Sequence, residues 1–310
     1  MKKGETIVIA LGGNSLLKKG QKPTINNQFK NTKETLTKLI PLIKSNKIVI
    51  THGNGFQVGN ILIRVEESLG KAYSIPLEIC VAESQGEIGY MIEQNLQNIL
   101  QKNQIKKPVV SVLTQVIVNK KDPAFKDPTK PIGPFYTKTQ ATKLKKKGFK
   151  VVNQIGRGYR KVVPSPKPIS IDDVKIIQAL LEFKSIVIAA GGGGVPVIKE
   201  NNLLKGVPAV IDKDLASACL ANSLKAKTLI ILMEEASIYS NYKKKNQKPI
   251  RKLTLKEAKE LQPTLPKGSV GPKIQAAINF IKKGGSKVII TSASKLKQAL
   301  IGKAGTTITI

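Results

Sequence analysis

Apolar positions along the chain fall into two kinds of pattern. Short runs rich in β-branched residues occur at positions 7–11, 48–51, 109–113, 186–190, 228–232 and 288–291. Near-continuous apolar runs of this length are typical of strands in a parallel sheet that is covered on both faces. The pattern therefore predicts an α/β fold built around a mainly parallel, open sheet.

Segments with a helical period of 3.6 residues separate these runs. The expected helices cover residues 26–44 and 58–69, open at Asp172-Asp173 with acids in the first turn, and run from Pro272 to Gly284-Gly285. Helices that alternate with parallel strands pack on both faces of the sheet. We therefore expect a three-layer αβα sandwich, and 310 residues suffice for one large domain, 1–310, with an insertion.

Two proline-rich stretches interrupt this alternation. Prolines stand at positions 123, 128, 131 and 134, and again at 164, 166 and 168. Proline cannot donate a hydrogen bond to a sheet or continue a helix. We therefore expect residues 118–168 to form a small inserted subdomain, a lid, rather than a second full domain.

The net charge of +32 suggests a nucleic-acid binder, but the residue types weaken that inference. Arginine, the preferred reader of bases and phosphates, occurs only four times, and aromatic residues make up 4% of the chain. The excess is scattered lysine, including the triplets 145–147 and 243–245. Solvated faces are the favoured explanation, with at most unspecific nucleic-acid binding.

The counts of histidine and cysteine exclude several kinds of site. His52 is the only histidine, and the cysteines are Cys80 and Cys219, so no disulfide framework or zinc cluster is expected. The G-x-S-x-G motif of many Ser-His-Asp hydrolases is absent from the sequence, which argues against such an enzyme. We expect two free, buried thiols and no metal held by the protein itself. No run approaches a membrane span. The apolar run 7–11 that follows the basic residues 1–3 is too short for a signal peptide and ends at Gly12, so we expect a cytoplasmic protein with no membrane partner.

Glycines follow three of the predicted strands. The loops are Gly12-Gly13-Asn14-Ser15, His52-Gly53-Asn54-Gly55 and the four glycines 191–194. Ligands of open parallel sheets bind at the carboxyl ends of the strands, and glycine lets backbone N–H groups converge on an oxyanion. Three such loops in one chain favour a phosphate or carboxylate site over plain turns.

Positive groups for such a site must come from lysines, since no G-x-x-x-x-G-K-[ST] motif is present. Asp212-Lys213-Asp214 places a lysine between two acids before a predicted helix. Lys273 lies in the first turn of another helix, where the dipole favours anions. These lysines stand out because aspartate, glycine and proline surround them, whereas most lysines here are surface residues.

These glycine loops and lysines resemble the motifs of the carbamate kinases, of the amino-acid kinase superfamily. Besides the loops and lysines above, the matching stretches are His52-Gly53-Asn54-Gly55-x-Gln57-Val58-Gly59, Glu83-Ser84-Gln85-Gly86-x-Ile88-Gly89-Tyr90, Asp127-Pro128-Thr129-Lys130-Pro131-Ile132-Gly133, Gly156-Arg157-Gly158, residues 162–168, 210–214 and Gly271-Pro272-Lys273. They follow one another along essentially the whole chain. Departures from the family pattern are Phe56, Asn153, Gln154, Tyr159, Met233, Glu234 and Val270.

The resemblance implies reversible phosphoryl transfer between carbamoyl phosphate and ADP with Mg²⁺, giving ATP and carbamate in arginine catabolism. It implies a carbamoyl-phosphate half in residues 1–205, a nucleotide half in 206–310 and a homodimer. Gly12, Gly13 and Asn14 resemble the phosphoryl-side loop, and Gly53, Asn54 and Gly55 the carbamoyl-side loop. Two other readings stay open: another kinase of this superfamily with a different acylphosphate or nucleoside monophosphate, and a degenerate kinase fold that binds polyanions.

Four charged residues would carry the catalysis that the resemblance implies. Lys130 resembles a lysine that the lid lowers onto the transferring phosphoryl group, and Asp214 an organiser with Lys213 beside it. Lys273 resembles the lysine that binds nucleotide phosphates, and Mg²⁺ would be held mainly by those phosphates. The implied nucleotide-binding residues are Lys213, Met233, Tyr239, Tyr242, Gly271 and Lys273.

Overall fold

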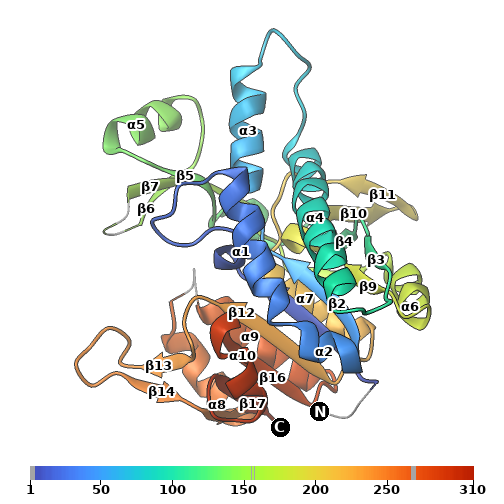
Figure 1. Ribbon diagram of the computed structural model, residues 1–310. Helices are drawn as coiled ribbons and strands as arrows, with labels where there is room; N and C mark the ends of the chain where they lie inside the picture. The colour runs from blue at the N-terminus through green and yellow to red at the C-terminus, as the bar shows by residue number, and fades with distance from the viewer. Residues whose placement is uncertain (1–3, 155, 157, 267–269) are drawn as a thin grey trace.

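A large sheet occupies the centre of the computed structural model, which describes residues 4–154, 156, 158–266 and 270–310 (Figure 1). Its strand order is β15-β17-β16-β12-β1-β2-β9-β3. The strands are β1 (Thr6–Leu11), β2 (Lys47–His52), β3 (Val109–Ser111), β9 (Ile186–Ile188), β12 (Thr228–Met233), β15 (Lys252–Thr254), β16 (Lys287–Ser292) and β17 (Thr306–Thr309). The six strands expected from the sequence are mutually parallel, and β17 alone pairs antiparallel, with β16. The prediction of a mainly parallel sheet is confirmed.

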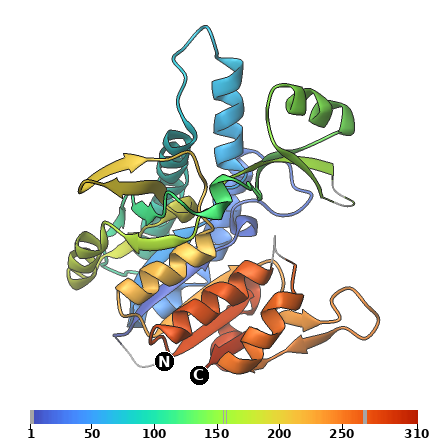
Figure 2. The same cartoon turned by 180° about the vertical axis from the view of Figure 1, so that it is seen from behind.

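Helices cover both faces of this sheet, as expected (Figures 1 and 2). One face packs against α1 (Ile25–Thr37), α2 (Ile40–Ser45), α4 (Leu77–Lys102) and α10 (Leu296–Leu300). The other packs against α6 (Val174–Glu182), α7 (Lys213–Ser223), α8 (Leu255–Leu261) and α9 (Val270–Lys282). The three-layer αβα sandwich is therefore confirmed.

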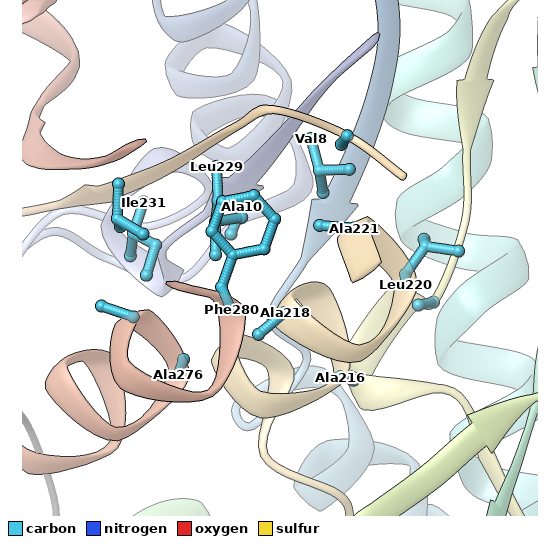
Figure 3. Packing of buried hydrophobic residues seen from close by; sticks show 14 of the residues in the cluster. Val8, Ala10, Ala216, Ala218, Leu220, Ala221, Leu229, Ile231, Ala276 and Phe280 are labelled. Carbon is cyan, nitrogen blue, oxygen red and sulfur yellow. The ribbon is translucent and has the colours of Figure 1, made fainter. Parts of the chain in front are cut away.

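Strand β1 shows how the apolar runs fill two cores at once. Successive side chains of a strand point to opposite faces. Ile7, Ile9 and Leu11 enter the core on the α1 and α4 side, and Val8 and Ala10 enter the core on the α7 and α9 side. The second core includes Leu229, Ile231, Leu220 and Phe280 (Figure 3). A strand buried on both faces must be apolar throughout, which explains the unbroken runs.

Smaller sheets lie outside the sandwich. Strands β4 (Gln115–Val118), β8 (Pro168–Ile171), β10 (Val195–Glu200) and β11 (Leu203–Gly206) form a four-stranded sheet, and β13 (Ile238–Ser240) pairs with β14 (Lys248–Ile250). Strands β5 (Lys130–Tyr136), β6 (Val151–Gln154) and β7 (Gly158–Val163) form a third sheet, which we call the lid sheet. It carries α5 (Lys138–Lys146) and projects from the body beside α3 (Gln57–Glu67) (Figures 1 and 2).

The expected single helix over residues 26–44 is wrong, because the segment folds as α1 and α2. Pro41 lies at the start of α2. Its ring nitrogen cannot donate to the carbonyl four residues earlier, and the ring clashes with that turn. The chain therefore breaks at Lys38 and Leu39, and both pieces still bury their apolar faces in one core.

Other boundaries also differ from the expected ones. Leu69 lies beyond the end of α3 and is exposed. Strands β3 and β9 end at Ser111 and Ile188, because the chain turns there. The acids before α6 precede its first turn, and the Asp173 carboxylate accepts a hydrogen bond from the Gln115 amide at 2.8 Å.

Both cysteines are free thiols, as expected, although only Cys80 is fully buried and Cys219 is half-buried. Across the described residues, no helix combines the length and the apolar character needed to cross a membrane. Residues 1–3 and Arg157, which the sequence analysis used, lie outside the described residues.

Candidate active site

The three glycine loops meet at one edge of the central sheet. They follow β1, β2 and β9, which are neighbours in the strand order, so their carboxyl ends lie together. Residues from all three loops line one cavity of about 200 Å³. The loop residues in this lining are Gly13, Gly53, Asn54, Gly55 and Gly192. We call it the phosphoryl cavity.

Close contacts between the loops fix the floor of this cavity. Gly192 has φ +64, and a Cβ there would lie 2.1 Å from Asn54 Nδ2, so only glycine fits. The buried Asn54 amide donates to Ser84 Oγ on α4 at 2.8 Å. Next to it, Gln85 donates to the Thr114 carbonyl at 3.1 Å and accepts from the Thr114 amide at 3.0 Å. The 83–90 motif, for which the sequence suggested no role, therefore braces the loops from behind.

Asp214 lies at the centre of a buried charge cluster. Its two carboxylate oxygens accept hydrogen bonds from Lys213 Nζ at 2.5 Å and from Lys273 Nζ at 3.0 Å. The side chain is 3% exposed. Burial opposes ionisation, but the two lysine charges and their hydrogen bonds outweigh it and hold the Asp214 pKa well below its usual range. The carboxylate is thus a permanent anion between two cations.

Asp212 is a second acid of the site, which the sequence analysis did not list as a functional residue. One oxygen caps α7 by accepting hydrogen bonds from the amides of Asp214 and Leu215, and the other accepts from Lys130 Nζ at 2.5 Å. Burial opposes its ionisation, but the Lys130 charge prevails and lowers the Asp212 pKa. The signal was present in the sequence, because an acid just before a helix is a typical N-cap.

The two lysines of the Asp214 cluster respond differently to burial. Burial lowers the pKa of Lys213, and the nearby Asp214 charge only partly offsets it. For Lys273 burial acts in the same direction, but Asp214 outweighs it and raises the pKa. Of the two, Lys273 therefore holds its proton more firmly. An incoming anion would further favour the charged form of both.

A second cavity, of about 390 Å³, joins the first at Gly13, Lys213 and Lys273, which line both. We call it the nucleotide cavity. Apolar and aromatic side chains form much of its wall: Met233, Ile238, Tyr239, Tyr242, Leu265, Pro266 and Val270. Gly12 and Asn14 line this cavity and not the phosphoryl cavity. Gly271 lines neither, and its amide donates to the Pro266 carbonyl at 3.1 Å, which supports the wall.

Two glutamates that sequence reasoning did not assign to the site also line the nucleotide cavity. Glu234 accepts a hydrogen bond from Asn14 Nδ2 at 2.8 Å, which ties the first glycine loop to the end of β12. Glu235 accepts from the Tyr242 hydroxyl at 2.7 Å, and this bond raises the pKa of Tyr242 to about 12. Nothing in the local sequence pattern could pair positions 14 and 234.

His52 lies beneath the glycine loops and is 1% exposed. Its Nδ1 is 3.2 Å from the Gly53 carbonyl oxygen. Burial, helped by the charge of Lys213 and only partly opposed by that hydrogen bond, lowers the pKa of His52 to about 4. The imidazole is therefore neutral near pH 7, and it supports the loops rather than supplying charge.

The acids of the site are poorly suited to bind a metal directly. All four oxygens of Asp212 and Asp214 are engaged by lysines or backbone amides. Elsewhere in the described parts of the chain, too, no three His, Cys, Asp or Glu side chains are grouped so that they could hold an ion. A divalent cation at this site would need its ligands from the substrate.

Comparison with known proteins agrees with this arrangement. The model of the amino acid kinase family matches residues 5–292. A carbamate kinase of Thermococcus kodakarensis is 46% identical over 97% of this chain and 98% of its own, and carbamate kinase 3 of Staphylococcus aureus is 47% identical over 97% and 98%. Carbamate kinase from Giardia lamblia bound to citric acid superposes with a TM-score of 0.94 at 39% identity, covering 100% of this chain and 99% of its own.

The Giardia lamblia enzyme bound to AMP-PNP gives a TM-score of 0.90 at 40% identity, with coverage of 100% and 99%. These matches span nearly the full length of every chain compared. The chain is therefore a phosphotransferase that belongs to the amino acid kinase family and, within it, to the carbamate kinases.

Proposed function

We propose that this chain catalyses reversible phosphoryl transfer between carbamoyl phosphate and ADP, giving ATP and carbamate. The observation that carries the proposal is the junction of the two cavities at Gly13, Lys213 and Lys273. One cavity is small and lined by glycine loops and charge, and the other is larger and largely apolar. A phosphoryl group that passes between two substrates must cross such a junction.

The nucleotide lies in the second cavity, within the half formed by residues 206–310. Tyr239, Tyr242 and Met233 offer apolar and aromatic surface for a base. The phosphates extend over Gly13 towards Lys273 and Lys213. AMP-PNP binding by the Giardia lamblia enzyme supports an adenine nucleotide.

Carbamoyl phosphate lies in the first cavity, against loops contributed by the half formed by residues 1–205. Backbone N–H groups of the loops at Gly13, Asn54 and Gly55 face its oxygens, whereas the Gly53 amide donates to the Leu11 carbonyl at 3.2 Å. Neither substrate needs a nucleophile or a general base from the protein, because the acceptor oxygen of ADP is already anionic. The chemistry therefore depends on position and charge.

The charged cluster stabilises the transferring phosphoryl group. This group passes through a loose transition state whose charge is spread over equatorial oxygens. Asp214 holds Lys213 and Lys273 in fixed positions through charge-assisted hydrogen bonds. Lys130 exchanges its bond to Asp212 for the phosphoryl oxygens when the lid, residues 118–168, closes.

Mg²⁺ enters as part of the nucleotide substrate. The carboxylates of Asp212 and Asp214 are already engaged, so the ion would be held mainly by phosphate oxygens of the nucleotide, where it would neutralise their negative charge. The released carbamate then decomposes to ammonia and carbon dioxide. Arginine catabolism by the deiminase route, the homodimer and the cytoplasmic location stay predictions from the family resemblance, and light scattering on the purified protein tests the dimer.

The decisive experiment measures ATP formation by purified protein from ADP, Mg²⁺ and carbamoyl phosphate. Acetyl phosphate replaces carbamoyl phosphate in a parallel assay, and UMP is offered with ATP as an alternative acceptor. We expect carbamoyl phosphate to react at least about tenfold faster than either alternative, because a site built for the carbamoyl amide loses hydrogen bonds with the others. A faster reaction with acetyl phosphate or UMP would contradict the proposal.

A further inference from the structure

The lid sheet is fastened to α3, although in the figures the two look like separate projections (Figures 1 and 2). Gly133 of β5 donates its amide to the Gly55 carbonyl at 2.8 Å. A Cβ on Gly59 of α3 would lie 2.0 Å from Gly133 Cα, so the strand and the helix touch backbone to backbone. Ile132 is buried in one cluster with Val58 and Ile61 of α3. Apolar packing therefore joins Ile132 and Gly133 of β5 to the first half of α3.

A partly buried ion pair, in which the Glu66 side chain is 25% exposed, adds a second attachment. Lys161 of β7 is 4% exposed, and its Nζ lies 2.6 Å from both carboxylate oxygens of Glu66 on α3. The same Nζ lies 3.8 Å from the centroid of the Phe149 ring. A buried lysine is stable only when it is paired, and loss of its partner is strongly destabilising. The pair is thus a strong constraint between β7 and α3.

The strand register links this pair to the catalytic lysine. Lys161 stands opposite Ile132, and Val163 stands opposite Lys130, two residues further along each strand. Residues two apart on a strand lie on the same face of the sheet. Lys161 and Lys130 therefore lie on the same face of the lid sheet, and the ion pair attaches this face to α3. At the other end, α3 follows directly on the loop Gly53–Gly55, which lines the phosphoryl cavity.

From these contacts we propose that Glu66 and Lys161 are positioning residues for phosphoryl transfer. Their ion pair makes α3 and the lid sheet one rigid unit, so that Lys130 and the carbamoyl-side loop keep a fixed relation when the lid moves. The proposal rests on the proposed function for the role of Lys130. It adds that residues 57–67, outside the proline-rich insertion, belong to this unit, which Val58 and Ile61 also join to Cys80 and Val81 of α4.

Variants of the pair test this role. Glu66→Gln and Lys161→Met should each lower kcat for ATP formation about 10- to 100-fold, because small misplacements of a catalytic group are that costly. The KM for ADP should change less than about threefold, because neither residue lines the nucleotide cavity. The matched control is Glu67→Gln, at an exposed position next to Glu66. The kcat of the double variant should be no lower than that of the more impaired single variant, since the effects of coupled residues are not additive.

Two outcomes would overturn the positioning role. One is that both single variants keep kcat within about twofold of Glu67→Gln, and the other is that the two losses multiply in the double variant. The unmodified protein is assayed before any variant. If it makes no ATP from carbamoyl phosphate, the proposed function is wrong, which is a different result from failure of the positioning role.

Hydrogen exchange on the unmodified protein tests the rigid unit without any variant that could misfold. On addition of AMP-PNP with carbamate, peptides covering 57–67 and 130–136 should change protection together. A change in 130–136 with 57–67 unchanged, or no change in either, would overturn the rigid unit. This readout does not depend on turnover, so it separates failure of the unit from failure of the proposed function.

Discussion

Two lysine–aspartate groups face the same cavity, and the fold holds them in different ways. Asp214, Lys213 and Lys273 come from α7 and α9, two helices of the sandwich that pack on each other, and their side chains are 3%, 12% and 15% exposed. Lys130 comes from the lid sheet, has one carboxylate partner, Asp212, and is 25% exposed. The first group, which we call the fixed group, is built into the core. The second, which we call the movable group because we propose that the lid opens, joins the lid sheet to the start of α7.

This difference suggests a division of labour. Charge that must be present throughout the reaction is best placed where surrounding packing prevents reorganisation. Charge needed only at the moment of transfer can come from an element that opens for substrate entry. The difference also implies that variants of the fixed group should cost more activity than variants of the movable group.

The largest effect is expected for Asp214→Asn. The amide cannot neutralise Lys213 and Lys273, so both lysines lose their charge-assisted hydrogen bonds and their alignment. We expect ATP formation to fall on the order of 10²- to 10³-fold, as for loss of one preorganised electrostatic group. Asp172→Asn, at an exposed position, is the control, and circular dichroism checks folding. A folded Asp214→Asn with near wild-type turnover would remove the central role of this residue.

A smaller loss is expected for Asp212→Ser, the matched change in the movable group. Serine still caps α7, so the helix is preserved while the charge that holds Lys130 is lost. Because Lys130 keeps its charge and can still reach the phosphoryl group, we expect about a tenfold loss of kcat. Steady-state kinetics measures it. If this loss equals or exceeds that of Asp214→Asn, the distinction between fixed and movable groups is wrong.

The fixed core could be predicted from sequence much more fully than the lid attachment. Six apolar runs located six strands of the central sheet, because strands buried on both faces leave an unbroken apolar signal. Strands as short as β15 and β17, with three and four residues, leave no such signal, and the sequence analysis did not predict them. Pro41 indicates the break between α1 and α2. The prediction of a single helix was wrong because it relied on the apolar period, which continues across this proline.

Some features of the site could likewise be predicted from the sequence, and others could not. Glycines after strands indicated an anion site because the carboxyl ends of neighbouring parallel strands must meet. The contact of Lys273 with Asp214 spans 59 residues, and that of Lys130 with Asp212 spans 82, so neither follows from local pattern. Lys273 was a candidate already from its place in the first turn of a helix, but only the family resemblance gave Lys130 a role. Neither argument indicated the Lys161–Glu66 pair.

Ligand-dependent proteolysis should distinguish the two regions directly. Trypsin has many lysines to cut in residues 118–168, and cleavage needs local opening. ADP together with carbamoyl phosphate should slow cleavage there severalfold, while cleavage at exposed lysines of the nucleotide half that lie outside the cavity lining, such as Lys283, keeps its rate. Gel electrophoresis with mass spectrometry follows both sites. Equal cleavage of 118–168 with and without ligands would argue against lid closure.

A pH titration tests the support beneath the fixed group. The pKa of His52 lies at about 4 in the folded protein and near 6.5 when unfolded. Between these values the unfolded state binds a proton that the folded state does not, so stability falls as pH falls from 6.5 to 4 and then levels off. The loss from this group is on the order of 3 kcal/mol. It is absent above pH 6.5.

His52→Gln isolates that contribution. Its stability relative to the unmodified protein, from urea unfolding at several pH values, should improve by about the same 3 kcal/mol between pH 6.5 and pH 4. The acids of the site should not add to this difference, because their pKa values are lowered and the same in both proteins. A stability difference independent of pH would show that His52 titrates normally.

The smallest effect on catalysis is expected for the exposed lysines of α5. Lys145, Lys146 and Lys147 are exposed at the end of this helix, on the lid but away from Lys130. Changing all three to Gln should leave ATP formation within about twofold of wild type, since exposed charges far from the reacting atoms contribute little. It should weaken DNA binding, which we expect to fall steeply between about 50 and 200 mM salt and to ignore base sequence. Filter binding at several salt concentrations measures this. Sequence-selective binding at physiological salt would revive a nucleic-acid function, whereas lost ATP formation in the folded triple variant would extend the movable group to α5.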